Sequence, residues 1–368
     1  MIKVGVIADQ TGPMSFMGNA DANVAKMVID DINAEGGLLD QQIELYLEDS
    51  ETTDEAAEAA GAKLVEQDQV DVIFGGILSS TRQAIKASAV TKGKTLYIYP
   101  EQYEGQEADP LIFCTGPVPA QQVDPLIPWL IEQTGAKKFA LPSADYVWPR
   151  IMNEKVRKIV EAAGGEIVEE DYYPLDHMDY GETVEKIMSS GAEVVFNTIV
   201  PPGVVPFFEQ LHKAGFSGQL VCTYFDETCL NLIPAEQVEG LYSCLDYYQD
   251  AGDPFSKELL ERYEERYPGG EVIFTGGGAC SGMYRGMRLW EAAVRDAGSL
   301  DQEGVVAALD HAKIADGPGG PAEMVPGQHH VRMNMYIGQV RDGAIETVKS
   351  LGVVDPDEAM VQAAVQTA

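Results

Sequence analysis

The sequence predicts an α/β protein built from two doubly wound lobes with a ligand cleft between them. The chain has 368 residues, which is too long for one ordinary hydrophobic core and suits two domains of roughly 150–200 residues. Short apolar runs alternate with amphipathic stretches from the first residues onward, as in parallel sheets covered by helices. A second set of alternating elements begins near Ala120, and this repetition predicts the second lobe.

The first set of elements fills the first hundred residues. Apolar residues at helical spacing, including Val24, Met27 and Val28, predict a helix that stops at Gly36-Gly37. In chain order we expect strands at 3–8, 43–48, 70–74 and 95–99, and helices at 20–35, 53–67 and 80–91.

The second set follows the same alternation, and a tail of different character comes after it. For the second set we expect helices at 121–134, 148–163, 181–190 and 206–214, and strands at 138–142, 166–173, 194–198 and 219–223. For the tail we expect helices at 253–267, 278–297 and 303–311, then a hairpin of 334–341 with 344–350. Asp342-Gly343 supplies the hairpin turn.

The expected strands indicate where a ligand would bind. In open α/β sheets ligands bind beyond the C-terminal ends of the strands. Six loops follow such strand ends in the two sets, and we expect them to face the cleft: 9–18, 75–81, 99–105, 143–149, 199–204 and 224–228.

Charge and cysteine content exclude several classes of partner. The chain has 59 acidic against 25 basic residues, a formal net charge of −34, which repels nucleic acid and anionic membranes. We favour solubility or salt adaptation as the reason, and a negative field that attracts a cationic ligand is the second interpretation. The five cysteines include no CxxC pair, so we expect buried free thiols and neither disulfides, a metal nor another cofactor.

Hydropathy and the first residues bear on where in the cell the protein is found. No segment has the roughly 18 uninterrupted apolar residues that span a bilayer. Residues 1–7 read directly as a strand, so the protein is either cytoplasmic or an exported protein whose signal peptide has been trimmed.

Two strings near the start carry a resemblance, Thr11-Gly12-Pro13 and Ile32-Asn33-Ala34-Glu35-Gly36-Gly37. With the order of the elements, they resemble the type I periplasmic binding proteins of the leucine/isoleucine/valine-binding family. Later strings are similar to the urea- and short-chain-amide-binding branch of that family. These strings are Ser79-Ser80-Thr81-Arg82, Tyr99-Pro100 with Tyr103-Glu104-Gly105, Gly116-Pro117-Val118-Pro119-Ala120-Gln121-Gln122, 143–150, Val194-Val195-Phe196-Asn197-Thr198 and His329-His330.

The resemblance implies a function as well as a fold. It implies the solute-binding component of an ABC importer, a periplasmic monomer that closes by hinge motion around an amide-, urea- or amino-acid-like solute and delivers it to a membrane permease. The three crossings between the lobes would divide the chain into 1–119 plus 251–325 and 120–250 plus 326–368. A cytoplasmic amide-sensing regulatory protein of the same fold is the alternative, and an amide hydrolase is a more distant one.

Serines at the start of an expected helix form the first candidate site. The hydroxyl of Ser79 or Ser80, together with free helix N–H groups, would make a socket for a carbonyl or carboxylate oxygen. The alternative is plain N-capping, and the family position favours a ligand contact for Ser79.

The loop after the next strand supplies Tyr99, Glu101 and Gln102. A tyrosine at a strand end can wall a pocket and offer its hydroxyl. The resembling branch has a neutral residue where Glu101 stands, and a carboxylate in a closed cleft requires a cation. Two alternatives remain, in which Glu101 points outward or pairs with an arginine of the protein such as Arg150.

In the second lobe, the resemblance implies aromatic ligand walls at Tyr146 and Trp148. Trp148 either narrows the pocket or offers its face to a cation, and the alternative is a structural tryptophan at a helix start. Val200 belongs to a proline-rich turn whose backbone could approach a ligand.

Further acidic residues follow later strands. In the wider family an acidic residue in the region of Asp226 or Glu227 pairs with a ligand ammonium group, and Asp246 follows the next strand-like run. Glu101, Asp226 or Glu227, and Asp246 could therefore converge on a cationic ligand such as a guanidinium or amino-amide compound. The alternative is that they belong to a generally acidic surface.

The sequence offers no catalytic pattern. GxSxG, HExxH, the P-loop and GxGxxG after the first strand are all missing from the sequence. The adjacent pair His329-His330 does not have the spacing of a helical metal site, so a structural role is expected. We therefore expect a binding protein and not an enzyme.

Overall fold

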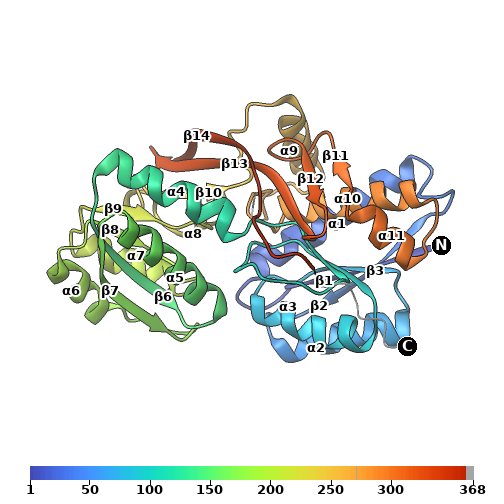
Figure 1. Cartoon of the computed structure of the whole chain (residues 1–368), viewed down its shortest axis with the longest axis horizontal. Coiled ribbons are helices and arrows are strands. Elements are labelled where there is room, and N and C mark those ends of the chain that lie inside the picture. Colours follow the sequence, from blue (N-terminus) through green and yellow to red (C-terminus); the bar gives the residue numbers. More distant parts are fainter. Residues whose placement is uncertain (271, 362–368) are drawn as a thin grey trace.

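The computed structural model describes residues 1–270 and 272–361, and it consists of two α/β lobes lying side by side (Figure 1). The expected fold class is confirmed. Each lobe contains a parallel section of one long curled sheet, and helices cover both faces of each section.

The first lobe holds five parallel strands, and the side chains of all but the edge strand β2 (Ile43–Asp49) are almost wholly buried, as expected when helices cover both faces. In spatial order they are β2, β1 (Ile2–Ala8), β3 (Val72–Gly75), β4 (Leu96–Tyr99) and β5 (Ile112–Cys114). Helices α1 (Ser15–Ala34) and α10 (Ser281–Ala297) pack on one face. Helices α2 (Asp54–Lys63) and α3 (Ser79–Ile85) pack on the other and continue as π-helical turns Leu64–Asp68 and Lys86–Lys92.

The second lobe repeats this arrangement with the same strand order. Its strands are β7 (Glu166–Tyr173), β6 (Lys138–Ala144), β8 (Val194–Phe196), β9 (Gln219–Val221) and β10 (Tyr242–Leu245). Its helices are α4 (Pro119–Thr134) and α5 (Val147–Ala162) on one face, α6 (Gly181–Ser190) and α7 (Val204–Lys213) on the other, and the short α8 (Glu227–Leu232) and 3-10 turn Ala235–Gln237 after β9.

From its start to β14, the chain passes between the lobes three times. It crosses from β5 to α4, returns from β10 to α9 (Pro254–Arg266), and crosses again along β13 (His330–Arg341). The first residue of β13 pairs with β5 and its later residues pair with β10, so one strand belongs to both lobes. The remaining elements are α11 (Gln302–Leu309), β11 (Lys313–Ile314), β12 (Ala322–Val325) and β14 (Ala344–Val354).

The segment after β14 returns to the first lobe. The carboxylate of Glu358 accepts a hydrogen bond from the Gln106 N–H at 2.6 Å, and the Val361 N–H donates to the Gly327 carbonyl at 2.7 Å. The division into 1–119 plus 251–325 and 120–250 plus 326–368 stays a prediction, and these contacts lead us to group 355–361 with the first lobe. Residues 362–368 of that division lie outside the described residues.

Several element boundaries differ from the sequence-based expectation. The first helix begins at Ser15 and not at residue 20, because Gly18 packs directly on the backbone of Asp9, where a Cβ atom would lie 2.2 Å from the Asp9 carbonyl oxygen. The helix expected from residue 278 begins at Ser281. The strands β5 and β12 were not predicted, and β10 was noted only as a strand-like run before Asp246, because three or four residues are too few to show a period.

All five cysteines are free and buried, as expected. Burial raises the pKa of the Cys114 and Cys222 thiols to about 12, because the thiolate is poorly solvated there.

Within the described residues, no helix has both the length and the apolar character needed to cross a membrane.

Candidate ligand pocket between the lobes

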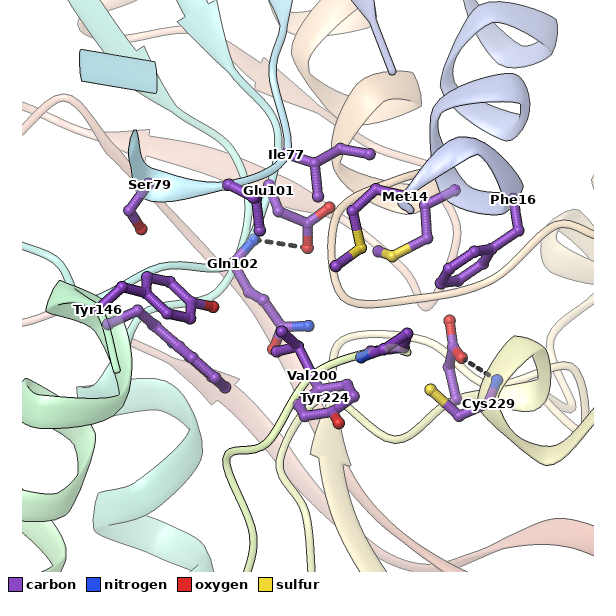
Figure 2. A pocket seen from close by; sticks show the side chains of 15 residues that line it. Met14, Phe16, Ile77, Ser79, Glu101, Gln102, Tyr146, Val200, Tyr224 and Cys229 are labelled. Carbon is purple, nitrogen blue, oxygen red and sulfur yellow. Dashed lines mark hydrogen bonds between the residues drawn. The ribbon is translucent and has the colours of Figure 1, made fainter. Parts of the chain in front are cut away.

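A pocket lies between the lobes, at the C-terminal ends of strands from both (Figure 2). All six of the loops singled out in the sequence contribute to its lining, namely those after β1, β3 and β4 in one lobe and after β6, β8 and β9 in the other. The pocket and its mouth hold about 540 Å³ of empty space, within the range of small-molecule sites. The fifteen lining residues are Met14, Phe16, Met17, Ile77, Leu78, Ser79, Glu101, Gln102, Tyr146, Trp148, Val200, Pro201, Tyr224, Asp226 and Cys229.

Aromatic and apolar side chains form most of the wall. The rings of Tyr146 and Trp148 stack with centroids 6.2 Å apart, and Trp148 meets Tyr224 at 5.9 Å with its ring edge-on. On the opposite side, Met14 and Phe16 project from the beginning of α1 (Figure 2). Such walls suit an apolar or planar ligand body and also offer ring faces to a cation.

Glu101 is the most unusual residue of the lining. Its side chain is only 3% exposed; Oε1 accepts a hydrogen bond from the Gln102 N–H at 3.1 Å, and Oε2 has no partner. Burial raises the pKa of the Glu101 carboxyl well above its usual value, and the nearby charge of Asp226 raises it further. Both sequence-based alternatives are wrong: Glu101 does not point outward, and no arginine of the described residues pairs with it, since Arg150 pairs with exposed Asp145 at 2.6 Å.

Close backbone packing holds Glu101 in place. Gly278, just before α10, has φ +145°, and a Cβ atom there would lie 2.5 Å from the Glu101 Cα and 2.6 Å from Oε1. A Cβ atom at Gly116 would lie 2.3 Å from the Glu101 carbonyl carbon. Since only glycine leaves room at both positions, the carboxyl has little freedom to move out of the pocket.

Asp226 is the second carboxyl group of the lining. It caps the N-terminus of α8 by accepting a hydrogen bond from the Cys229 N–H at 2.9 Å (Figure 2). Burial raises the pKa of Asp226, while the bonds from the helix N-terminus lower it. The neighbouring Glu227 is not in the lining and accepts a hydrogen bond from the Gln249 N–H at 2.7 Å.

Asp246 does not join the other two carboxylates at the pocket. Its Oδ2 lies 2.5 Å from Nη2 of buried Arg285, and its Oδ1 accepts a hydrogen bond from the Gly277 N–H at 2.8 Å. The predicted convergence of three carboxylates is therefore reduced to Glu101 and Asp226.

Ser79 lies in the lining as the first residue of α3, and its environment differs from the expected socket. Its hydroxyl donates to Oε2 of Glu104 at 2.5 Å, and Oε1 of Glu104 lies 2.7 Å from Nη2 of Arg82. Ser79 is not the N-cap, which is Leu78. Ser80 is half-buried and outside the lining.

Tyr99 lies behind the pocket wall. It is fully buried, its hydroxyl donates to the Ile77 carbonyl at 2.6 Å, and the Arg82 guanidinium lies 5.2 Å from its ring centroid. The Gln102 side chain does line the pocket, and its Oε1 accepts a hydrogen bond from Nε2 of Gln122 at 2.8 Å.

Sequence reasoning found most of the polar lining and missed much of the apolar part. The structure brings seven of the ten predicted residues into the lining and leaves out Ser80, Tyr99 and Asp246. The predicted residues that line it are Ser79, Glu101, Gln102, Tyr146, Trp148, Val200 and Asp226. The methionines, Phe16 and Tyr224 lie in the six predicted loops, where an aromatic or apolar residue in an otherwise polar loop was the available signal.

Comparison with known proteins gives consistent matches along the chain. Residues 1–344 match the family model described as periplasmic binding protein. The chain is 23% identical over 373 residues to Leu/Ile/Val-binding protein homolog 7 of Brucella melitensis biotype 1, covering 94% of this chain and 91% of that protein.

Two solved structures show the same fold. A leucine-binding protein from Thermotoga maritima MSB8 has a TM-score of 0.84 at 18% identity, covering 97% of this chain and 99% of that one. A solute-binding protein of an ABC transporter from R. palustris, in complex with benzoate, has a TM-score of 0.86 at 19% identity, covering 98% and 99%.

Proposed function

Because the chain belongs to the periplasmic binding protein family, we propose that it is the solute-binding component of an ABC importer. It closes around one small molecule in the pocket between its lobes and delivers it to a membrane permease. The support is a pocket built from both lobes, which are joined by a few connecting segments, the arrangement that hinge closure requires. In this proposal it works in the periplasm as a monomer.

We further propose that the solute is amide-, urea- or amino-acid-like and carries a positive charge. The observation that carries this is the buried Glu101 carboxyl, whose Oε2 has no partner. Among the described residues, those lining the pocket include no lysine, arginine or histidine, so the chain itself offers no counter-ion there. A bound cation would supply the partner that a buried carboxylate requires.

The opposite wall can hold an uncharged acceptor. Nε1 of Trp148 is buried without a hydrogen-bond partner, and the hydroxyl of Tyr146 points toward the centre of the pocket (Figure 2). A carbonyl oxygen of an amide or urea group would accept hydrogen bonds from these groups. A guanidinium or amino-amide compound combines both features.

Calorimetric titration with urea, acetamide, guanidine, benzoate and amino acids tests the proposal. We expect the cationic solutes to bind at least about tenfold more tightly to the wild type than to Glu101→Gln, because the variant lacks the counter-charge. Glu132→Gln, on an exposed part of α4, is the matched control and should bind like the wild type.

The outcomes separate the parts of the proposal. Tight binding of neutral amides that is undiminished in Glu101→Gln would contradict the cationic solute. The proposal that the protein is a solute receptor would be contradicted if no solute bound. It would also be contradicted if no solute reduced the radius of gyration of the protein in solution scattering. Release of ammonia from urea or acetamide would identify a hydrolase instead.

A further inference from the structure

The direction of one hydrogen bond determines what Ser79 can offer a ligand. Glu104 is ion-paired with Arg82 at 2.7 Å, and an ionised carboxylate only accepts hydrogen bonds. The single hydroxyl proton of Ser79 therefore points to Glu104, 2.5 Å away. Only the lone pairs of the Ser79 oxygen remain for the pocket, so this position favours a ligand that donates.

The two buried arginines do not offer the pocket a positive charge. Arg82 and Arg285 are both almost fully buried, and neither is in the lining. Arg82 is held by Glu104 and lies over the rings of Tyr99 and Tyr103 at 5.2 and 4.3 Å. Arg285 is held by Asp246, as described above. Neither positive charge is available to a ligand carboxylate.

The remaining polar groups of the lining point to the same ligand chemistry. Its two carboxyl side chains are those of Glu101 and Asp226, and no lysine, arginine or histidine is among the described residues that line it. The hydroxyl of Tyr224 donates to the Ile199 carbonyl, so it too offers the pocket only an acceptor. Tyr146, Trp148 and the amide NH₂ of Gln102 are neutral donors, which suit a carbonyl oxygen but do not neutralise a carboxylate placed beside Glu101 and Asp226.

From these contacts we propose that the pocket selects a carboxylate-free organic cation with N–H donors, such as an amine, amidine or guanidine, and rejects the amino acid that differs from it only by a carboxylate. The inference rests on the proposed solute-binding function and narrows it, because it removes amino acids from the set of candidate solutes.

Matched pairs of compounds test this selection by calorimetry. The pairs are agmatine with arginine, tyramine with tyrosine, cadaverine with lysine, and argininamide with arginine. In at least one pair, we expect the carboxylate-free compound to bind at least about tenfold more tightly than the amino acid. Equal or tighter binding of the amino acids would overturn the inference, while the proposed function as a receptor for a cationic solute would still hold. If no cation bound and neutral amides did, the cationic solute of the proposed function would fail as well.

Glu104→Gln tests the role of the Ser79 hydrogen bond. The new amide can still accept from Arg82 with its oxygen while its NH₂ donates to Ser79, which frees the Ser79 proton to point into the pocket. The preference for the carboxylate-free compound over its acid should then fall several-fold. Glu107→Gln is the matched control, since Glu107 lies in the same loop, pairs with Lys86 at 2.6 Å and is outside the lining.

Ser79→Ala provides a second measurement that leaves the Glu104–Arg82 pair in place. Loss of the acceptor should weaken binding of the cation several-fold, while circular dichroism shows that the variant is still folded. An unaltered preference in Glu104→Gln together with unaltered affinity in Ser79→Ala would show that Ser79 does not set the selectivity.

Discussion

A carboxyl group buried without a cation holds its proton more tightly than one in water. Glu101 is in this position, and the other acidic groups around it add to the effect. They come from three further elements: Asp226 from α8, Asp246 at the end of β10, and Asp21 from α1, whose carboxylate oxygens are both buried without partners. Burial raises the pKa of Asp21 as well as that of Glu101.

The first prediction at the residue scale concerns pH. Below its raised pKa, Glu101 is neutral in the free protein, and a bound cation favours the ionised form, so binding expels a proton. Affinity for agmatine should therefore rise with pH, by up to about tenfold per unit, and level off above that pKa.

Titrations from about pH 5.5 to about 8.5, in buffers of different ionisation heat, measure both the affinity and the protons released. Agmatine keeps its guanidinium and amine charges over most of this range. The pH dependence should flatten in Glu101→Gln. An affinity that is independent of pH in the wild type would contradict the prediction.

Single residues were predictable where their role depends on a position along the chain. Glu101 and Asp226 follow strand ends, which the alternation of elements reveals. The pairing of Asp246 with Arg285 was not predictable, because the partners are 39 residues apart in different elements and no spacing rule joins them. The hydrogen bond from Ser79 to Glu104 was hidden for the same reason.

At the scale of elements, the loops after the strands form the pocket because both lobes have the same strand order. Parallel strands end at one edge of a sheet, so the loops of each lobe gather at one edge, and the two edges face each other. The alternation of apolar and amphipathic segments was sufficient to predict this. It did not reveal how the loop before α10 packs on Glu101, since that contact depends on glycines with no periodic pattern.

The prediction at this scale concerns that loop. In Gly278→Ala the new methyl group would lie 2.5 Å from the Glu101 Cα, and the glycine φ of +145° is strained for alanine. We expect displacement of Glu101 and a loss of solute affinity of about tenfold or more, measured by calorimetry. In the control Gly252→Ala, a Cβ atom has no heavy atom within 4 Å, so affinity should be unchanged. Equal affinity in both variants would show that the close packing of Gly278 on Glu101 is unimportant for binding.

At the scale of the whole molecule, β13 makes the two sheet sections one continuous sheet. The sequence predicted two lobes from its repeated pattern and a hinge from a resemblance. It did not reveal that residues 355–361 return to the first lobe, because that segment has no regular structure and is placed by a few hydrogen bonds, such as that between Glu358 and Gln106.

The prediction at this scale follows from the net charge of −34. Repulsion among the carboxylates disfavours the compact state and is screened by salt. The melting temperature should therefore rise by several degrees between about 0.05 M and about 1 M KCl, measured by circular dichroism. Glucose at equal osmolality is the control for solvent effects unrelated to charge. A melting temperature that stayed constant or fell with KCl would show that repulsion among the carboxylates does not strongly destabilise the folded state.

The burial of all five cysteines has a practical consequence. Their thiols are shielded and their raised pKa values keep them protonated, so maleimide dyes would leave the native protein unlabelled. A single cysteine introduced at Val147, which is 44% exposed and adjoins Trp148, would then be the one labelled position. A fluorophore there would sit beside the pocket and report solute binding optically, so the molecule is suited to serve as a biosensor without removal of any native residue.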